Sequence, residues 1–407
     1  MNEMAKELIG FLNTDEYKKK IKPDKFSINS KIFLKDIFIL MKQGDEYYEK
    51  HKSKMVLNIT NDIPISNDFN YIPNIMRSYI INMKGICYEY IFTINTKKYK
   101  VSFYIENNEK IDNDKNIKKI FVWLFIANAY SNEKCSQYLN INLYLTNLKK
   151  VLPENSKFIK KEHANSAFTT SCKKNTEINL FRKEEWFKVL IHESFHCTGL
   201  DFSELEHTNS NSKVLTIFPV NSDVRLFETY CEMWAEIINV MFISYNKSNP
   251  IENLNEDIDK LIVKTEKLLY YERLFSLFQC AKVLHFFGIK YKNLYEKDLN
   301  STKLRIVKYK EDTNVLSYYI IKSIYMFFIN DFIEWCIENN LSNGVVSLNF
   351  NKNEETIDSY IEFIKDHFLN SSYIGSLTLF EEFFKNIHGK TISSELYNTL
   401  RMSVNEE

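Results

Sequence analysis

Glycine and proline are scarce in this chain, which has 8 Gly and 6 Pro among 407 residues. Because these two residues interrupt helices and strands, their scarcity predicts a fold rich in regular secondary structure. An excess of one charge is also lacking, since 53 Lys and Arg balance 53 Asp and Glu. A formal net charge of zero offers no electrostatic attraction for nucleic acid or an anionic membrane, and we expect neither as a partner.

Long uninterrupted apolar runs are absent from the sequence as well. Residues 120–129 are too short to span a bilayer, and residues 320–332 are interrupted by Lys322, Asn330 and Asp331. Both stretches are therefore expected in the protein core. The first 13 residues lack the apolar segment of a signal peptide, which predicts that the protein is not exported.

The 7 cysteines are odd in number, widely scattered and without a Cys-x-x-Cys pair. This pattern is typical of reduced thiols in an intracellular protein rather than of a secreted disulfide framework. Cys172 and Cys197 lie near the motif described below, but at spacings that do not suit a metal site with it, and both are expected to be buried thiols. Together with the N-terminus, the cysteines predict a cytoplasmic or otherwise intracellular location.

Hydrophobic periodicity predicts an α+β fold with both helices and strands. Strands are expected at residues 86–94 and 98–105, which form a hairpin, at 140–146, and more weakly at 167–171, 178–181 and 345–348. Helices are expected at 30–48, 183–198 and 226–241, in two pieces over 251–287, and over most of 314–405. Loops are expected at 106–116, 206–212 and 248–256. We divide the chain into a mixed α/β N-terminal region (1–112), a core (113–300) and a helical C-terminal region (301–407).

The most informative segment reads His-Glu-Ser-Phe-His at residues 192–196. His192 and His196 are four residues apart, so on a helix they lie one turn apart on the same face. Two neutral imidazoles in this arrangement can bind one Zn²⁺, and Glu193 lies beside the water that such a metal activates. Since only 8 histidines occur in the chain, a chance pairing is improbable. The segment predicts a zinc-dependent hydrolase with Glu193 as general base.

A catalytic zinc needs three protein ligands, and the motif supplies two. One known pattern places the third just downstream, as His-Glu-x-x-His-x-x-Gly-x-x-His or the same pattern ending in Asp. Gly199 fits that pattern, but Phe202 occupies the ligand position and cannot bind a metal, and Asp201 comes one residue early.

A helix over residues 226–241 offers another source for the third ligand. Glu228, Glu232 and Glu236 share one face of this helix, at i, i+4 and i+8. Glu228 as the ligand with Glu232 behind it is the preferred arrangement, and Glu232 with Glu236 is the alternative. A bound cation would relieve the repulsion within this row of carboxylates.

With these two segments the chain resembles the gluzincin type of zincin metallopeptidases over roughly residues 140–240. The resemblance implies a zincin-like catalytic core with a mixed sheet, an active-site helix and a glutamate helix. It also implies that His192, His196 and Glu228 bind zinc, that Glu193 is the general base and that Glu232 orients a ligand histidine. The same segments are similar to uncharacterised zincin-like proteins of large DNA viruses, which would place the protein in a host cytoplasm or virion.

The family commonly uses a later His or Tyr to stabilise the oxyanion, and it pairs extended substrate with an edge strand. Five residues are candidates for the donor, with His285 taken first although its apolar helix also fits a core histidine: His285, Tyr270, Tyr271, Tyr318 and Tyr319. Residues 165–171 are the candidate edge strand, with Asn165 and Ala167 offering backbone groups. Residues 200–226 are the candidate substrate-covering loop.

The sequence therefore favours a zinc metallopeptidase that acts on a peptide or protein substrate. The alternative is a structural or interaction protein, virion-associated if viral, on an inactive zincin scaffold. A zinc hydrolase that cleaves another kind of bond is a third reading, because fold and metal alone do not define the bond that is cleaved.

Overall fold

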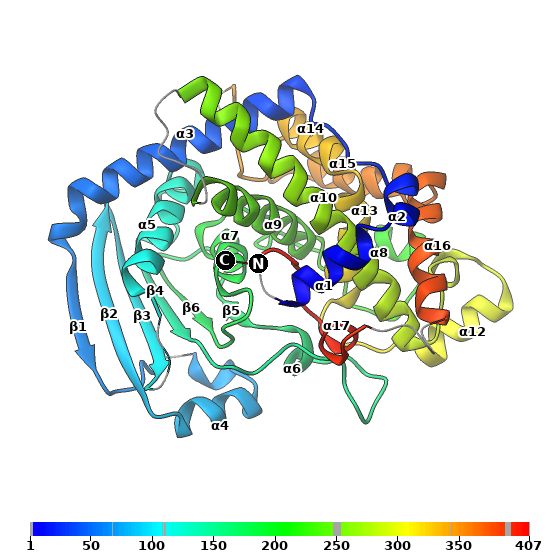
Figure 1. The fold of residues 1–407 in the computed structure, drawn as a ribbon, viewed down its shortest axis with the longest axis horizontal. Helices are drawn as coiled ribbons and strands as arrows, with labels where there is room; N and C mark the ends of the chain where they lie inside the picture. Colours follow the sequence, from blue (N-terminus) through cyan, green and yellow to red (C-terminus); the bar gives the residue numbers. More distant parts are fainter. Residues whose placement is uncertain are drawn as a thin grey trace.

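The computed structural model describes residues 3–66, 68–107, 109, 111–246, 254–342, 344–386 and 392–406. A mixed β-sheet lies on one side of the molecule and most of the helices on the other (Figure 1). The general α+β class predicted from the sequence is therefore confirmed. Most of the predicted loop at residues 248–256 and the first residues of the helix expected at 251–287 lie outside the described residues.

The sheet has six strands in the order β1-β2-β3-β4-β6-β5. The strands are β1 (Val56–Thr60), β2 (Gly85–Ile94), β3 (Lys97–Glu106), β4 (Tyr138–Tyr144), β5 (Ala167–Thr169) and β6 (Asn175–Leu180). β3, β4 and β6 run parallel, whereas β1, β2 and β5 pair antiparallel with their neighbours. The predicted hairpin is confirmed as β2 and β3, and Asn95 in its turn has the left-handed φ of 52° that such turns favour.

Both faces of the sheet are covered. Helices α5 (Asn113–Tyr130) and α7 (Trp186–Thr198) contact each other and the sheet on one face. On the other face, α4 (Asn74–Asn82) and η2 (Phe69–Tyr71) pack on Tyr104, Tyr144 and Phe181. Trp123 of α5 stacks on Phe195 of α7 with ring centroids 6.0 Å apart, and its Nε1 donates to Ser194 Oγ at 2.7 Å. These contacts position α7, which carries the His-Glu-x-x-His motif, against the sheet.

The remaining elements form the helical side of the molecule, and helices are confirmed at the predicted 30–48 and over most of 314–405. They are α1 (Glu3–Leu12), α2 (Asp15–Lys20), α3 (Ile28–His51), η1 (Lys52–Lys54), α6 (Lys161–Ala164), α8 (Thr208–Ile217), α9 (Leu226–Asn246), α10 (Leu254–Phe287), α11 (Lys292–Tyr295), α12 (Leu299–Lys308), η3 (Leu316–Ile321), α13 (Lys322–Phe327), α14 (Ile329–Asn339), α15 (Glu354–His367), α16 (Ser371–Lys385) and α17 (Ser394–Asn398). A short pair, β7 (Leu341–Ser342) and β8 (Val345–Val346), confirms the first half of the strand expected at 345–348.

Several sequence predictions of element boundaries are wrong. The loop expected at 106–116 ends early, because α5 begins at Asn113 after the N-cap Asp112. α10 is one continuous helix rather than two pieces, because its described span contains no glycine or proline to interrupt it. The segment at 206–212, expected as a loop, runs into α8, which also occupies part of the proposed covering loop. α7 starts three residues late because Glu185 takes a left-handed φ of 58°, whereas Gly199 ends the helix as predicted, with a φ of 71°.

The larger of the buried clusters takes residues from Leu8 to Val404, and so from all three predicted regions. The two apolar stretches at 120–129 and 320–332 contribute fully buried residues to it, including Trp123 and Ile324. The expectation that both lie in the core is therefore confirmed. No helix among the described residues has the length and apolar character needed to cross a membrane. The division into three regions stays a prediction.

Candidate metal centre

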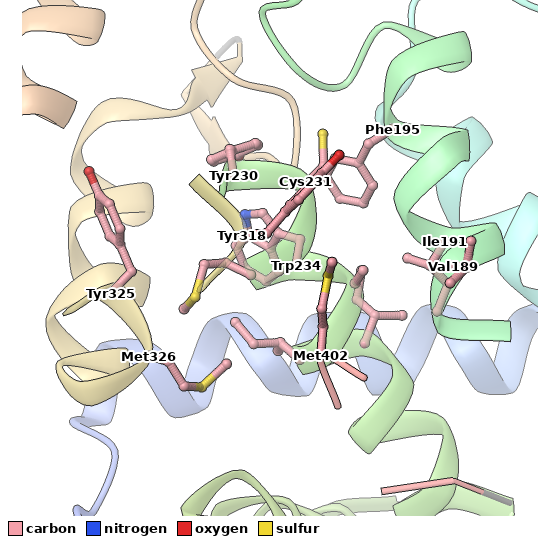
Figure 2. Close-up of a cluster of buried hydrophobic side chains, with 14 of the residues drawn as sticks. Val189, Ile191, Phe195, Tyr230, Cys231, Trp234, Tyr318, Tyr325, Met326 and Met402 are labelled. Atoms are coloured by element: carbon pink, nitrogen blue, oxygen red, sulfur yellow. The ribbon is translucent and has the colours of Figure 1, made fainter. Parts of the chain in front are cut away.

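The candidate site lies where α7 packs against α9. Val189, Ile191 and Phe195 of α7 belong to the same buried cluster as Tyr230 and Trp234 of α9 (Figure 2). Apolar packing holds the two helices together along their length. It brings a histidine-bearing face of α7 to a carboxylate-bearing face of α9.

His192, His196 and Glu228 converge at this helix pair. The Nε2 atoms of the two histidines lie 3.2 Å apart. Glu228 Oε2 lies 3.0 Å from His192 Nε2 and 3.4 Å from His196 Nε2. Zinc bonds of about 2.0–2.1 Å in a tetrahedron separate two ligand atoms by about 3.3 Å. The same separations also suit hydrogen bonds to a protonated imidazole. The distances therefore identify which residues converge, whereas a metal cation and a proton both fit between them. These three buried side chains form a group that can hold a metal ion.

Two further carboxylates hold the outer nitrogens of the imidazoles. His192 Nδ1 lies 2.9 Å from Glu232 Oε2, and His196 Nδ1 lies 2.6 Å from Asp201 Oδ2. An Nδ1–H that donates to a carboxylate leaves the Nε2 lone pair free for a metal and orients the ring. Glu228 therefore lies at the ligand-forming nitrogens and Glu232 behind His192, as in the preferred arrangement. In the alternative arrangement Glu236 would orient a histidine, but its carboxylate pairs with Lys322.

Sequence reasoning missed two of the residues around the histidines. The sequence pattern presents Asp201 only as a third ligand with unsuitable spacing, whereas the turn after Gly199 brings its carboxylate back to His196. Lys188 lies outside the motif, yet its ammonium pairs with Glu232, and both side chains are almost fully buried. The spacing carried a signal, because Lys188 precedes His192 by four residues and so lies on the same face of α7.

The site is rich in buried negative charge. Four carboxylates and one lysine lie around the two imidazoles: Glu193, Glu228, Glu232, Asp201 and Lys188. With neutral imidazoles their formal charge is −4 + 1 = −3. Burial lowers the pKa of His192, but hydrogen bonds with Glu228 and Glu232 outweigh it and raise the pKa above its usual value. The group therefore favours the uptake of positive charge, as protons or as a metal cation.

A cleft opens beside this group. It has a volume of about 620 Å³, and its walls include Glu193, His196, Glu228, Tyr318 and residues of β5. Burial raises the pKa of Glu193 above its usual value, which favours proton uptake by this carboxylate. A smaller cavity of about 40 Å³ adjoins His192 and is lined by Ala164, Val189 and Met402 among others.

Tyr318 is the oxyanion-donor candidate that the structure brings to the cleft. Its hydroxyl donates to Glu228 Oε2 at 3.0 Å, and it projects from the π-helical turn η3, a conformation frequent at functional sites. Burial and then the charge of Glu228 raise the pKa of Tyr318 well above its usual value, so the hydroxyl keeps its proton at neutral pH. The hydroxyls of Tyr270 and Tyr319 instead donate to backbone carbonyls of Ile21 and Leu400.

The structure does not place His285 with these residues. His285 is exposed near the end of α10, and its ring stacks on Phe384 at 5.7 Å. The two cavities beside His192 are lined by Tyr318 and not by His285. The apolar face of α10 points into the core, which turns His285 outward. Tyr318 therefore replaces it as the candidate donor.

The predicted edge strand lies at a sheet edge as β5, next to the cleft. The backbone groups of Asn165 are already hydrogen-bonded and do not suit pairing with a substrate. Its N–H donates to Lys161 O at 2.9 Å, and its C=O accepts from Arg182 Nε at 3.1 Å. Ala167 remains suitable. Phe181 N donates to Ser166 O, so in this antiparallel ladder Ala167 and Thr169 direct their backbone groups away from β6, toward the open edge.

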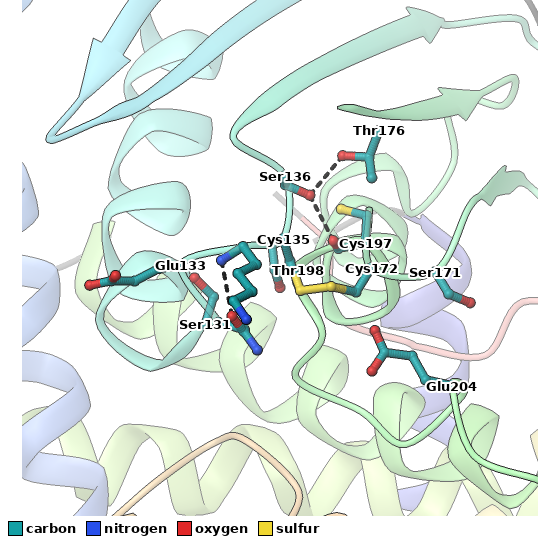
Figure 3. Close-up of a disulfide and its surroundings, with 12 residues drawn as sticks. Ser131, Glu133, Cys135, Ser136, Ser171, Cys172, Thr176, Cys197, Thr198 and Glu204 are labelled. Atoms are coloured by element: carbon teal, nitrogen blue, oxygen red, sulfur yellow. Dashed lines mark hydrogen bonds between the residues drawn. A yellow bond between two sulfur atoms is a disulfide. The ribbon is translucent and has the colours of Figure 1, made fainter. Parts of the chain in front are cut away.

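One cysteine prediction is wrong, because Cys135 and Cys172 form a disulfide beside the end of α7 (Figure 3). Tyr138 of β4 and Asn175 of β6 are paired residues in neighbouring parallel strands. Cys135 lies three residues before Tyr138, and Cys172 lies three residues before Asn175. The sheet thus brings them together, with Cα atoms 4.9 Å apart. Cys197 is a buried free thiol, as predicted. Disulfides persist mainly in oxidising compartments, so this bond gives no support to the predicted intracellular location. That location stays a prediction.

Comparisons with protein-family models, with curated proteins and with solved structures find no match to this chain. The likeness to zincins therefore depends on the residues and geometry described above.

Proposed function

We propose that this protein is a zinc-dependent metallopeptidase. The observation that carries the proposal is the convergence of His192, His196 and Glu228 within 3.0–3.4 Å of one another at a cleft that also contains Glu193. Two imidazoles and one carboxylate, with the cleft as an open position, are a donor set typical of catalytic zinc. The surplus of buried carboxylates supports a divalent cation over a neutral occupant.

A bound Zn²⁺ would lower the pKa of a coordinated water and polarise a substrate carbonyl. The carboxylate of Glu193 takes the proton of the attacking water and passes it to the leaving amine nitrogen. The hydroxyl of Tyr318 donates a hydrogen bond to the substrate oxygen as negative charge develops there. Asp201 and Glu232 hold the imidazole rings in place throughout.

The edge of β5 supports a peptide as the substrate class. An extended chain can pair with the outward backbone groups of Ala167 and Thr169, which uses hydrogen bonds common to every peptide. The cleft beside β5, about 620 Å³ in volume, has room for several residues of such a chain. The residues beside the cleft then determine which side chains are accepted.

The test uses the full chain purified without chelator. We expect about one zinc per chain by elemental mass spectrometry, and new termini in a denatured proteome that disappear when a chelator is added. His192→Ala should lose the zinc, whereas Glu193→Gln should keep the zinc and lose cleavage. New termini that persist at the same rate with purified Glu193→Gln would contradict the proposed mechanism.

An inactive scaffold is the second candidate function. The observation that favours it is the burial of the ligand group, since His192, His196 and Glu228 are each no more than 8% exposed. Stoichiometric zinc without new termini, in either the native chain or Glu193→Gln, would support this candidate over the peptidase.

A further inference from the structure

Strand β1 is an exposed edge strand at the end of the sheet opposite to β5. Figure 1 places it at the outer border of the molecule. All five of its residues, Val-Leu-Asn-Ile-Thr, are exposed, and none of them is charged. Edge strands in stable monomers are usually protected by lysine, proline or a covering segment, because their free backbone groups can pair with another chain. β1 lacks the lysine and the proline.

Apolar side chains line both faces of this edge. Leu57 and Ile59 are 47% and 60% exposed, and they lie opposite Tyr90 and Tyr88 of β2, on the face of the sheet that carries α5. On the other face, Val56 lies opposite Ile91, and both are exposed. A strand added beside β1 would therefore bury apolar surface on both faces as well as pair the backbone.

We propose that β1 pairs antiparallel with β1 of a second copy of this chain, about a two-fold axis at Asn58. This register is self-complementary, as a two-fold contact must be. It places Leu57 of one copy opposite Ile59 of the other, and Val56 opposite Thr60. The apolar strips on the α5-bearing face then continue across the axis.

The charges that flank β1 fit the same register. Lys54 and Asp62 are exposed, two residues before and two residues after the strand, and neither side chain has an ion-pair partner among the described residues. In the two-fold register the start of β1, which Lys54 precedes in η1, meets the end of β1 of the other copy, where the chain bends at residues 61 and 62. The two opposite charges therefore lie at the same end of the paired strands, and the axis repeats them at the other end. This charge complementarity selects a second copy as the occupant and opposes a one-residue slip of the strands.

The proposed pairing leaves the candidate metal centre accessible. The cleft lies at β5, and four strands separate β5 from β1 in the sheet order, so two copies would form one continuous sheet with a cleft at each outer end. Since only five residues pair on each side, we expect a reversible dimer. The proposal does not depend on the proposed function, because it involves none of the residues at the metal centre.

The experiment is sedimentation equilibrium of the full chain over a concentration series that reaches about 200 µM, a range chosen for a small interface. Ile59→Lys should raise the dimer dissociation constant by about tenfold or more, because it puts a charge in the apolar strip. Ile306→Lys, at an isoleucine on α12 that is 72% exposed, is the matched control and should leave the constant unchanged. Circular dichroism should show the same fold for all variants.

Charge exchange tests the register itself. Lys54→Glu alone and Asp62→Lys alone should each weaken the dimer, and the double variant should restore it to within about threefold of the native constant. A chain that stays monomeric throughout the series overturns the proposal. So does a dimer that Ile59→Lys leaves intact, a double variant that fails to recover, or growth into open-ended oligomers.

Discussion

Asp201 and Glu232 show how single buried carboxylates determine the orientation of a histidine. Each accepts from an Nδ1–H, and each is almost completely excluded from solvent. Asp201 also contacts Ser203, whose hydroxyl lies 3.0 Å from Oδ1. A carboxylate held on both oxygens cannot easily turn away from His196.

We expect Asp201→Asn to weaken zinc binding by about 10- to 100-fold, because the amide still fits the space but holds the imidazole less strongly. Competition with a chromophoric chelator measures the affinity. Asp259→Asn, at an exposed carboxylate of α10 that pairs with Lys35, is the control. An unchanged affinity in Asp201→Asn would show that the contact with His196 does not orient a ligand.

Tyr318 and His285 make a matched pair of tests for the oxyanion donor. Tyr318→Phe should lower kcat by about 100-fold with zinc content unchanged, since it removes one hydroxyl donor from the reaction centre. His285→Ala should leave kcat unchanged, because this exposed ring stacks on Phe384 and does not line the cleft. Kinetics on one peptide identified from the proteome digest compare the two. The opposite ranking would restore His285 as the donor.

At the scale of elements, the start of α7 is tied to the C-terminal segment through Glu185. Its carboxylate accepts from the backbone N–H of Met402 and Ser403 at 3.0 and 2.6 Å, and from Lys150 Nζ at 3.0 Å. The left-handed backbone of Glu185 directs the side chain to these partners. The N-terminal end of α7 is therefore anchored by Met402 and Ser403, more than two hundred positions away in sequence.

This anchor predicts a pH dependence of stability. Burial raises the pKa of Glu185, but Lys150, Lys188 and Arg401 outweigh burial and hold the pKa at about 2. Because the folded pKa is below the ordinary value of about 4.5, the stabilisation is present above pH 4.5 and is lost as the pH falls toward 2. The difference corresponds to roughly 3 kcal/mol. Glu185→Gln should reduce the loss of stability in this pH window.

Urea unfolding at several pH values measures this effect, with Glu154→Gln as the control at an exposed carboxylate. The native chain and Glu154→Gln should lose stability in parallel as the pH falls. Equal slopes in Glu185→Gln would mean that other acids dominate the acid transition.

At the scale of the whole molecule, the C-terminal segment is part of the core. Residues 399–405 are buried. Glu272 of α10 accepts from the backbone N–H of Val404 and Asn405, both at 2.9 Å, and Lys322 donates to Met402 O at 2.7 Å. Met402 also lines the small cavity beside His192. This segment thus links α10, α13 and α7 around the candidate site.

Deletion of residues 401–407 should lower the melting temperature strongly and weaken zinc binding, because buried Glu272 and Glu185 would lose their partners. Differential scanning calorimetry measures the first effect and elemental analysis the second. Replacing Val404 with Ala keeps the backbone donors and should cost far less. A truncated chain with native melting temperature and zinc content would contradict this role.

The sequence by itself determined the local features. The four-residue spacing of His192 and His196, the glutamates of α9 and the end of α7 at Gly199 depend on helix periodicity and backbone preferences, which act between near neighbours. The general α+β class followed for the same reason. Glu228, which lies at the Nε2 atoms of the histidines, is the ligand that the sequence favours. Helix periodicity alone left Glu232 open as an alternative, because both glutamates share one face of α9.

Only the tertiary structure decided which distant residues meet. The pairing of Cys135 with Cys172 needed the order of parallel strands, and the approach of Tyr318 to Glu228 needed the packing of η3 on α9. The outward position of His285 likewise depended on which side of α10 faces the core. These contacts span tens of residues in sequence and arise from how whole layers pack, for which local periodicity carries no information.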